Sequence, residues 1–280
     1  MASKIGILVI HGVGTQRSGY SGDMVREVSD RLDAHATSVV WEEVLWADVL
    51  APRERDLWKW MNDAKEPNGS SIDLDWPKIR KFLIHNVGDA LAYTRDVDPA
   101  SAYAQIHDIV DQKLRALKAS LGDPTAPIVV MGHSLGAHIM SNYIWDRQHG
   151  TGSLERIPTL AAMITFGCNI PLFSLSFDVA RPIDLPGTGI TKPRWKAASR
   201  WLNYVDEDDV LGWPLKTLYQ KNLSRLTAPQ KRTVSKIEDY EINVGGLLTN
   251  WNPAAHNRYW TDNDFTRPVA AYLTGLCQLL

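Results

Sequence analysis

The sequence contains very little cysteine. Its two thiols are Cys168 and Cys277, and no Cys-x-x-Cys pair or Cys/His cluster with the spacing of zinc ligands occurs. A disulfide framework and a structural zinc site are therefore excluded, and we expect both thiols to be reduced and buried. A chain of 280 residues needs no such staple, because it buries roughly three quarters of the surface that its unfolded form exposes.

The sequence also lacks an excess of charge of either sign. Its 30 Lys and Arg residues nearly balance its 32 Asp and Glu residues, so the formal net charge is −2 and the pI is about 6.4. Proteins that bind nucleic acids usually carry a basic face or a domain pI above about 9. We therefore expect no nucleic-acid partner.

Long hydrophobic runs are absent as well. The apolar run at 5–10 is shorter than the ~7–15 residues of a signal-peptide core, and no small-residue cleavage site follows it. No run approaches the ~20 apolar residues that a membrane-spanning helix needs. We expect no transmembrane segment and a cytoplasmic location.

The sequence does contain short apolar runs that alternate with helical patterns. Runs that predict buried strands occur at 5–10, 39–41 with 44–46, 128–131, 161–166 and 201–205, and helical spacing occurs at 23–36, 137–148 and 268–279. Buried strands separated by helices are typical of a parallel sheet covered on both faces, so the predicted fold class is α/β. No linker divides the chain, so we expect a single domain over 1–280. The tryptophan-rich stretch at about 50–100 is interpreted as a cap or insertion over the sheet.

The most informative motif is Gly132-His133-Ser134-Leu135-Gly136, which has the pattern G-x-S-x-G. It follows the predicted strand 128–131 and precedes a predicted helix, which is the context that lifts a serine hydroxyl above a sheet edge. Glycines are needed on both sides of the serine because side chains there would collide with the neighbouring strand and helix. Ser134 is therefore the candidate nucleophile, although a purely structural turn has the same pattern.

A glycine-rich segment, His11-Gly12-Val13-Gly14, follows the first predicted strand. A dinucleotide-binding loop would need a third glycine where Arg17 stands, and a P-loop would need a lysine where Tyr20 stands. Both phosphate-binding interpretations are therefore rejected, because each lacks a residue that contacts the phosphate. His11 itself is expected to pack and to stabilise the loop.

Together, the pentad around Ser134 and the His11–Gly14 segment resemble the α/β-hydrolase superfamily, in particular its lipase- and esterase-like members. The resemblance implies an α/β-hydrolase fold and an oxyanion hole. The backbone N–H groups of Val13 and Leu135 would stabilise the oxyanion of the tetrahedral intermediate. The motifs do not specify a substrate.

Hydrolases of this fold order their catalytic residues as Ser, then Asp or Glu, then His. Three histidines follow Ser134, and both His138 and His149 lie in the helix that the pentad opens, which leaves no room for an intervening acid. His256, in the segment 253–260, is therefore the candidate general base.

The candidate acid lies in an acidic turn that follows the predicted strand 201–205. By resemblance to lipases, where the acid precedes a short apolar pair and a proline-containing turn, Asp209 is favoured and Asp206 is the alternative. The turn contains four acidic residues. We expect one of them to be the catalytic acid and the other three to be solvated.

These residues predict a serine hydrolase that cleaves carboxylic esters, small-molecule or lipid, without a metal or organic cofactor. A thioesterase or phospholipase with the same residues, and a catalytically silent binding module, are the alternatives. A phospholipid substrate would require an exposed apolar patch around the site. Five tryptophans between the two motifs could line an acyl pocket or simply fill a core: Trp41, Trp46, Trp58, Trp60 and Trp76. The sequence does not indicate an oligomeric state.

Overall fold

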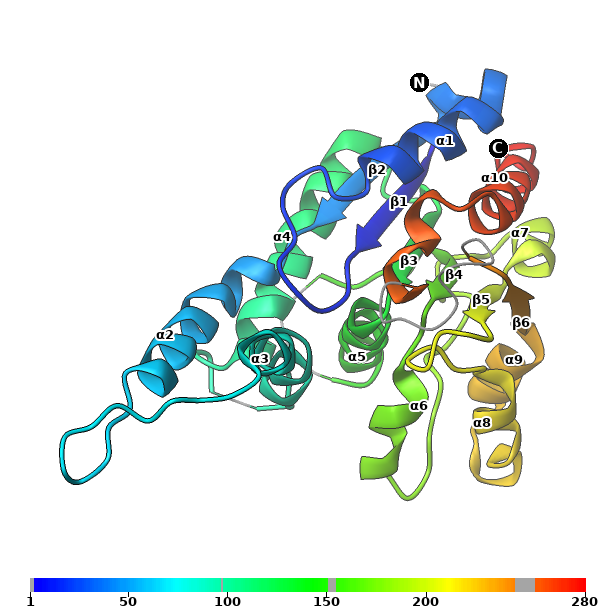
Figure 1. The fold of residues 1–280 in the computed structure, drawn as a ribbon. Coiled ribbons are helices and arrows are strands. Elements are labelled where there is room, and N and C mark those ends of the chain that lie inside the picture. Colours follow the sequence, from blue (N-terminus) through cyan, green and yellow to red (C-terminus); the bar gives the residue numbers. More distant parts are fainter. Residues whose placement is uncertain (1–2, 97, 151–154, 245–254) are drawn as a thin grey trace.

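A parallel sheet lies at the centre of the computed structural model, which describes residues 3–96, 98–150, 155–244 and 255–280 (Figure 1). In this part of the chain the sheet has six strands in the order β2-β1-β3-β4-β5-β6, and every neighbouring pair is parallel. The strands are β1 (Ile5–Ile10), β2 (Val39–Val44), β3 (Ile128–His133), β4 (Leu160–Phe166), β5 (Trp201–Asp206) and β6 (Ile237–Ile242). The predicted α/β class is confirmed.

Helices cover both faces of this sheet. Helices α4 (Ala102–Leu121) and α5 (Leu135–His149) pack on one face, and α1 (Gly22–Leu32) and α10 (Asn263–Cys277) lie together on the other (Figure 1). Four shorter helices follow β4 and β5: α6 (Ile170–Phe173), α7 (Pro193–Ala198), α8 (Lys216–Gln220) and α9 (Ala228–Lys236).

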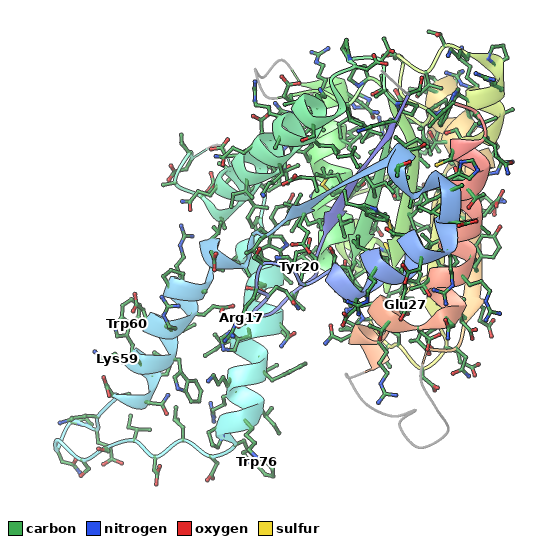
Figure 2. The ribbon with its side chains drawn as sticks, turned by 90° about the horizontal axis from the view of Figure 1, so that it is seen from above. Arg17, Tyr20, Glu27, Lys59, Trp60 and Trp76 are labelled. Carbon is green, nitrogen blue, oxygen red and sulfur yellow. The ribbon has the colours of Figure 1, made fainter. Side chains whose placement is uncertain are left out.

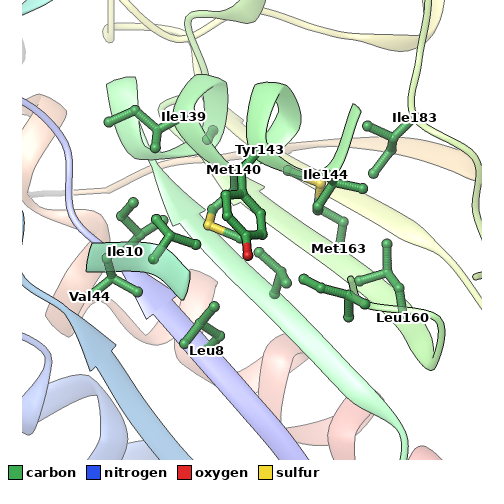
Figure 3. Packing of buried hydrophobic residues seen from close by; sticks show 14 of the residues in the cluster. Leu8, Ile10, Val44, Ile139, Met140, Tyr143, Ile144, Leu160, Met163 and Ile183 are labelled. Atoms are coloured by element: carbon green, nitrogen blue, oxygen red, sulfur yellow. The ribbon is translucent and has the colours of Figure 1, made fainter. Parts of the chain in front are cut away.

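Alternation along the strands divides the apolar residues between two cores. In β1, Leu8 and Ile10 belong to the cluster under α4 and α5, whereas Ile7 and Val9 belong to the cluster under α1 and α10. Figure 3 shows the first cluster, where side chains of α5 meet those of the strands. A strand that is buried on both faces has no polar side, which explains its unbroken apolar sequence.

The structure differs from the predicted elements at their ends, at one edge strand and in helix α4 (Ala102–Leu121), which the sequence analysis did not predict. Helix α10 begins at Asn263 rather than at Pro268, because the Asp262 side chain accepts a hydrogen bond from Asp264 N–H and caps the helix earlier. The second strand ends at Val44 and does not continue to residue 46 as predicted. The strand β6 was not predicted, because an edge strand with the sequence IEDYEI is partly exposed and has no apolar run.

The segment 50–100 contains two helices, α2 (Ala51–Asn62) and α3 (Pro77–Ala92). They form a hairpin that extends sideways beyond the sheet (Figures 1 and 2). The tryptophans between the two sequence motifs do not share one role, since Trp46 is fully buried whereas Trp60 and Trp76 are exposed. No helix within the described ranges is both long and apolar enough to span a membrane.

Candidate active site

Ser134 occupies a sharp turn between β3 and α5. Its backbone has φ 51° and ψ −126°, a conformation with positive φ that side-chain-bearing residues rarely adopt. The turn ends β3 at His133 and starts α5 at Leu135, so that Ser134 stands above the carboxyl edge of the sheet. Strain of this kind persists only where the surrounding packing enforces it.

The flanking glycines explain how so tight a turn fits. A Cβ atom on Gly136 would lie 2.3 Å from the His11 carbonyl oxygen, and one on Gly132 would lie 2.8 Å from Ala137 Cα. Both contacts are with backbone, which cannot move aside. The predicted reason for the two glycines is therefore confirmed, and a strained serine stands between a buried parallel strand and a helix. The surrounding fold is a parallel α/β sheet with helices on both faces.

The three side chains that the sequence singled out lie together above the carboxyl edge of the sheet. The Ser134 hydroxyl is 2.6 Å from His256 Nε2, and His256 Nδ1 is 2.9 Å from both carboxylate oxygens of Asp209. All three side chains are buried. With the proton of the neutral imidazole on Nδ1, the ring donates to Asp209 and accepts from the Ser134 hydroxyl. Of the segment predicted around His256, residues 253 and 254 lie outside the described residues.

Asp209 is held as an anion by the groups around it. Burial raises the pKa of its carboxyl, but hydrogen bonds from His256, Leu211 N–H and the Tyr259 hydroxyl outweigh burial and leave the pKa below its usual value. A carboxylate that accepts several hydrogen bonds favours its charged form. The charge therefore lies next to the imidazole nitrogen that donates to it.

Asp206, the alternative acid, faces elsewhere. Its carboxylate accepts hydrogen bonds from the backbone N–H groups of Val244 and Asp208. The expectation that this side chain is solvated was wrong, because Asp206 is buried and stabilises the backbone that follows β6. Asp206 and Asp209 thus have different partners, and within the described residues it is Asp209 that accepts the hydrogen bond from His256 Nδ1.

Two residues that the sequence analysis missed hold His256 and Asp209 in place. His133 Nε2 lies 2.6 Å from the His256 carbonyl oxygen, and burial above all lowers the pKa of His133 to about 3, so its neutral ring donates this bond. The Tyr259 hydroxyl donates to Asp209 and accepts from Asp206 N–H. His133 is the variable residue of the pentad and Tyr259 lies in no motif, so no sequence signal marked either.

The glycine-rich loop after β1 lies against the nucleophile. A Cβ atom on Gly12 would lie 2.6 Å from Ser134 Cβ, so the loop backbone approaches the serine as closely as it can. His11 is buried, stacks on Trp46 and accepts a hydrogen bond from Trp46 N–H, as expected of a packed histidine. Val13 follows Gly12 in this loop, and Leu135 is the first residue of α5, where N–H groups have no partner within the helix.

Other groups near this edge do not offer a competing chemistry. Cys168 is fully buried, and burial raises the pKa of its thiol to about 12, which disfavours the thiolate that a cysteine nucleophile requires. Within the part of the chain that the structure describes, no three His, Cys, Asp or Glu side chains gather as potential metal ligands.

Comparison with known proteins adds only distant similarities. No protein-family model and no curated protein sequence matches the chain. It is similar to a solved structure of a protein of unknown function from Agrobacterium tumefaciens (12% identity, 98% of this chain and 91% of that chain, TM-score 0.44). Esterase PE8 (15% identity, 97% and 92% coverage, TM-score 0.41) is a second such structure. A third is a soluble variant of monoglyceride lipase from Saccharomyces cerevisiae in complex with a substrate analog (11% identity, 96% and 87% coverage, TM-score 0.37). These values are too low to assign a function or a residue role to this chain.

Proposed function

We propose that the protein is a serine hydrolase that cleaves carboxylic esters through an acyl-enzyme on Ser134. The observation that carries this proposal is the continuous hydrogen-bonded series from the Ser134 hydroxyl through both nitrogens of His256 to the Asp209 carboxylate. A serine hydroxyl at its free pKa is a weak nucleophile, and an adjacent base with an orienting acid is what activates it.

In the proposed reaction, His256 Nε2 removes the Ser134 proton while Oγ attacks the ester carbonyl carbon. The tetrahedral intermediate collapses, the C–O bond to the alcohol breaks, and His256 returns its proton to the leaving alkoxide. Water then attacks the acyl-enzyme with His256 again as the base, which releases the carboxylic acid and restores the serine. Asp209 keeps the imidazole in the productive tautomer, and the Val13 and Leu135 N–H groups stabilise the oxyanion.

The proposal is tested by covalent labelling of the unmodified protein. A fluorophosphonate probe is expected to add once, and mass spectrometry of the digested adduct is expected to place the added mass on Ser134. Hydrolysis of p-nitrophenyl butyrate should be lost in proportion to labelling. A folded protein that reacts with neither reagent would instead be a catalytically silent module, which is the alternative from a different functional class.

Exposed apolar side chains near the site favour an ester with a long apolar part. One face of α3 carries Ile79, Phe82, Leu83, Val87 and Leu91 at helical spacing, and between 41% and 72% of each is exposed. Such a stripe normally faces a core, so its exposure indicates a surface that contacts something apolar. A hollow of about 450 Å³ lies on the same helix.

Apolar side chains are exposed both on α3 and on the segments after β4 and β5. Helix α3 contacts the loop after β1 through the hydrogen bond from Gly14 N–H to Asp89. Other exposed apolar residues occur beside Asp209 and in the segment that follows β4: Val210, Trp213, Leu172, Leu175 and Phe177. Trp60 and Trp76, with Lys59 nearby, lie toward the far end of the hairpin (Figure 2). Aromatic and basic side chains together are typical of helices that lie on a lipid surface.

A triple substitution on α3 tests this substrate class. Ile79→Ser, Phe82→Ser and Leu91→Ser combined should lower hydrolysis of a long-chain ester carried in anionic vesicles by about tenfold or more, since burial of one such side chain contributes ~1.5–3 kcal/mol. Hydrolysis of water-soluble p-nitrophenyl acetate should stay within about twofold of the unmodified protein. Rates of both reactions are measured for each variant.

The matched control for this triple substitution is Ile79→Val, Phe82→Leu and Leu91→Ile, which keeps the face apolar and should behave like the unmodified protein. Equal loss of both activities in the serine variant would indicate damage to the fold instead of a substrate surface. Acyl-CoA thioesters and phospholipids, compared at the same acyl length, separate a thioesterase or phospholipase from an esterase of simpler lipids.

A further inference from the structure

A buried carboxyl group of α3 contacts the loop after β1, which contains the proposed oxyanion donor Val13. Asp89 is only 3% exposed, and its Oδ2 accepts a hydrogen bond of 2.8 Å from Gly14 N–H. The bond joins the α2–α3 hairpin to the loop after β1, although the two residues are far apart in sequence. The position of this loop therefore depends on the position of α3.

The Gly14 bond acts on the peptide next to Val13. Val13 has two adjustable backbone angles, and the peptides on its two sides determine where its N–H points. On one side, the backbone of Gly12 packs directly against Ser134, which limits how the Gly12–Val13 peptide can turn. On the other side, the Val13–Gly14 peptide carries the N–H that Asp89 binds, and Gly14 has φ +89°, which a glycine adopts without strain. With both peptides fixed, the direction of the Val13 N–H is fixed as well.

The surroundings of Asp89 favour the neutral form of its carboxyl. The Asp89 carboxyl shares a side-chain hydrogen bond with Glu54 of α2. The carboxylate of Glu54 faces it from α2, and His85 Nδ1 lies 2.6 Å from Glu54 Oε2. Burial first, and then Glu54, raise the pKa of Asp89 to about 8, against the opposing effects of Gly14 N–H and His85. A neutral carboxyl still offers Oδ2 as an acceptor to the Gly14 N–H.

We propose that Asp89 is a positioning residue, which holds the Gly14 N–H and thereby aims the Val13 N–H at the oxyanion that forms on the substrate of Ser134. The proposal rests on the proposed function, because it assigns Asp89 to that reaction. The hydrogen bond needs an acceptor oxygen at Oδ2 and does not need a charge. A neutral amide in place of the carboxyl should therefore serve equally well.

The test compares Asp89→Leu with Asp89→Asn. Leucine has a similar shape but no acceptor, so kcat for p-nitrophenyl butyrate should fall on the order of 10²-fold, as on loss of an oxyanion donor, while KM changes less than about threefold. Asparagine retains an acceptor oxygen, so its kcat should stay within about threefold of the unmodified protein. Inhibition by a trifluoromethyl ketone, which forms the oxyanion adduct, should weaken with Leu and not with Asn.

Asn86→Ala is the matched control, because Asn86 lies on the same helix near Gly14 but its amide donates to the Phe82 carbonyl. It should leave kcat unchanged. If Asp89→Leu does not fold by circular dichroism, Asp89→Ala removes the same acceptor from a smaller side chain. A folded Asp89→Leu or Asp89→Ala with normal kcat, or an Asp89→Asn as impaired as either, overturns the positioning role. Absence of hydrolysis by the unmodified protein overturns the proposed function instead.

Discussion

Replacement of Ser134 by alanine is expected to abolish both fluorophosphonate labelling and ester hydrolysis, with a fall in kcat of about 10⁴-fold or more. The hydroxyl oxygen is the atom that would form the acyl bond, and it lies 2.6 Å from His256 Nε2. Alanine has no atom in its place. Alanine pays about the same cost as serine for φ 51°, so the fold should be unchanged. Labelling stoichiometry by intact-mass measurement and steady-state rates check this result.

Ser141→Ala is the control for Ser134→Ala. Ser141 is a buried serine of α5, the helix that follows Ser134, and has no place in the proposed reaction. It should label and hydrolyse as the unmodified protein does. Persistent labelling of Ser134→Ala would remove Ser134 from the role of nucleophile, and equal loss in both variants would indicate a disturbed α5.

Asp209→Asn is expected to lower kcat by about 10⁴-fold with little change in KM. The asparagine amide would donate to His256 Nδ1 and so favour the tautomer whose proton is on Nε2, which cannot accept the Ser134 proton. Substitution also removes the negative charge that stabilises the imidazolium, a charge that the hydrogen bonds from His256, Leu211 and Tyr259 maintain. The pH dependence and magnitude of kcat, measured on folded protein, check this prediction.

Asp206→Asn separates the two candidate acids. Because its carboxylate accepts from Val244 and Asp208 N–H groups, its loss should lower the unfolding temperature more than it lowers kcat. A fall of several thousand-fold in kcat with Asp206→Asn and a small effect with Asp209→Asn would reverse the assignment of the acid.

Local sequence determined much of the fold. The run Ile5–Ile10 is apolar without alternation because both of its faces are covered, so its burial could be predicted from composition alone. The strained turn at Ser134 could also be predicted, since two glycines at fixed distances from a serine serve a local geometric need. Strand β6 could not, because its charged side chains reflect an exposed edge and edges are decided by the whole sheet.

The candidate site divides in the same way. Ser134 carries a local signal, and chain order narrowed the histidines to His256, but the choice between Asp209 and Asp206 depended on a general likeness to lipases. The two residues are close in sequence, but the turn after β5 directs Asp209 toward His256 and Asp206 toward Val244. Backbone direction in such a turn follows from contacts with distant segments, which sequence spacing does not encode.

The sequence by itself determined a parallel α/β sheet, the strained turn at Ser134 and the order of the candidate groups along the chain, because these depend on side-chain volume and short-range backbone geometry. Only the tertiary structure decided that Asp209 lies beside His256 and that His133 and Tyr259 hold them. The same is true of the hydrogen bond between Asp89 of α3 and Gly14. These contacts join segments separated by tens of residues. Their geometry is fixed by how the helices pack on the sheet, a property of the folded chain as a whole.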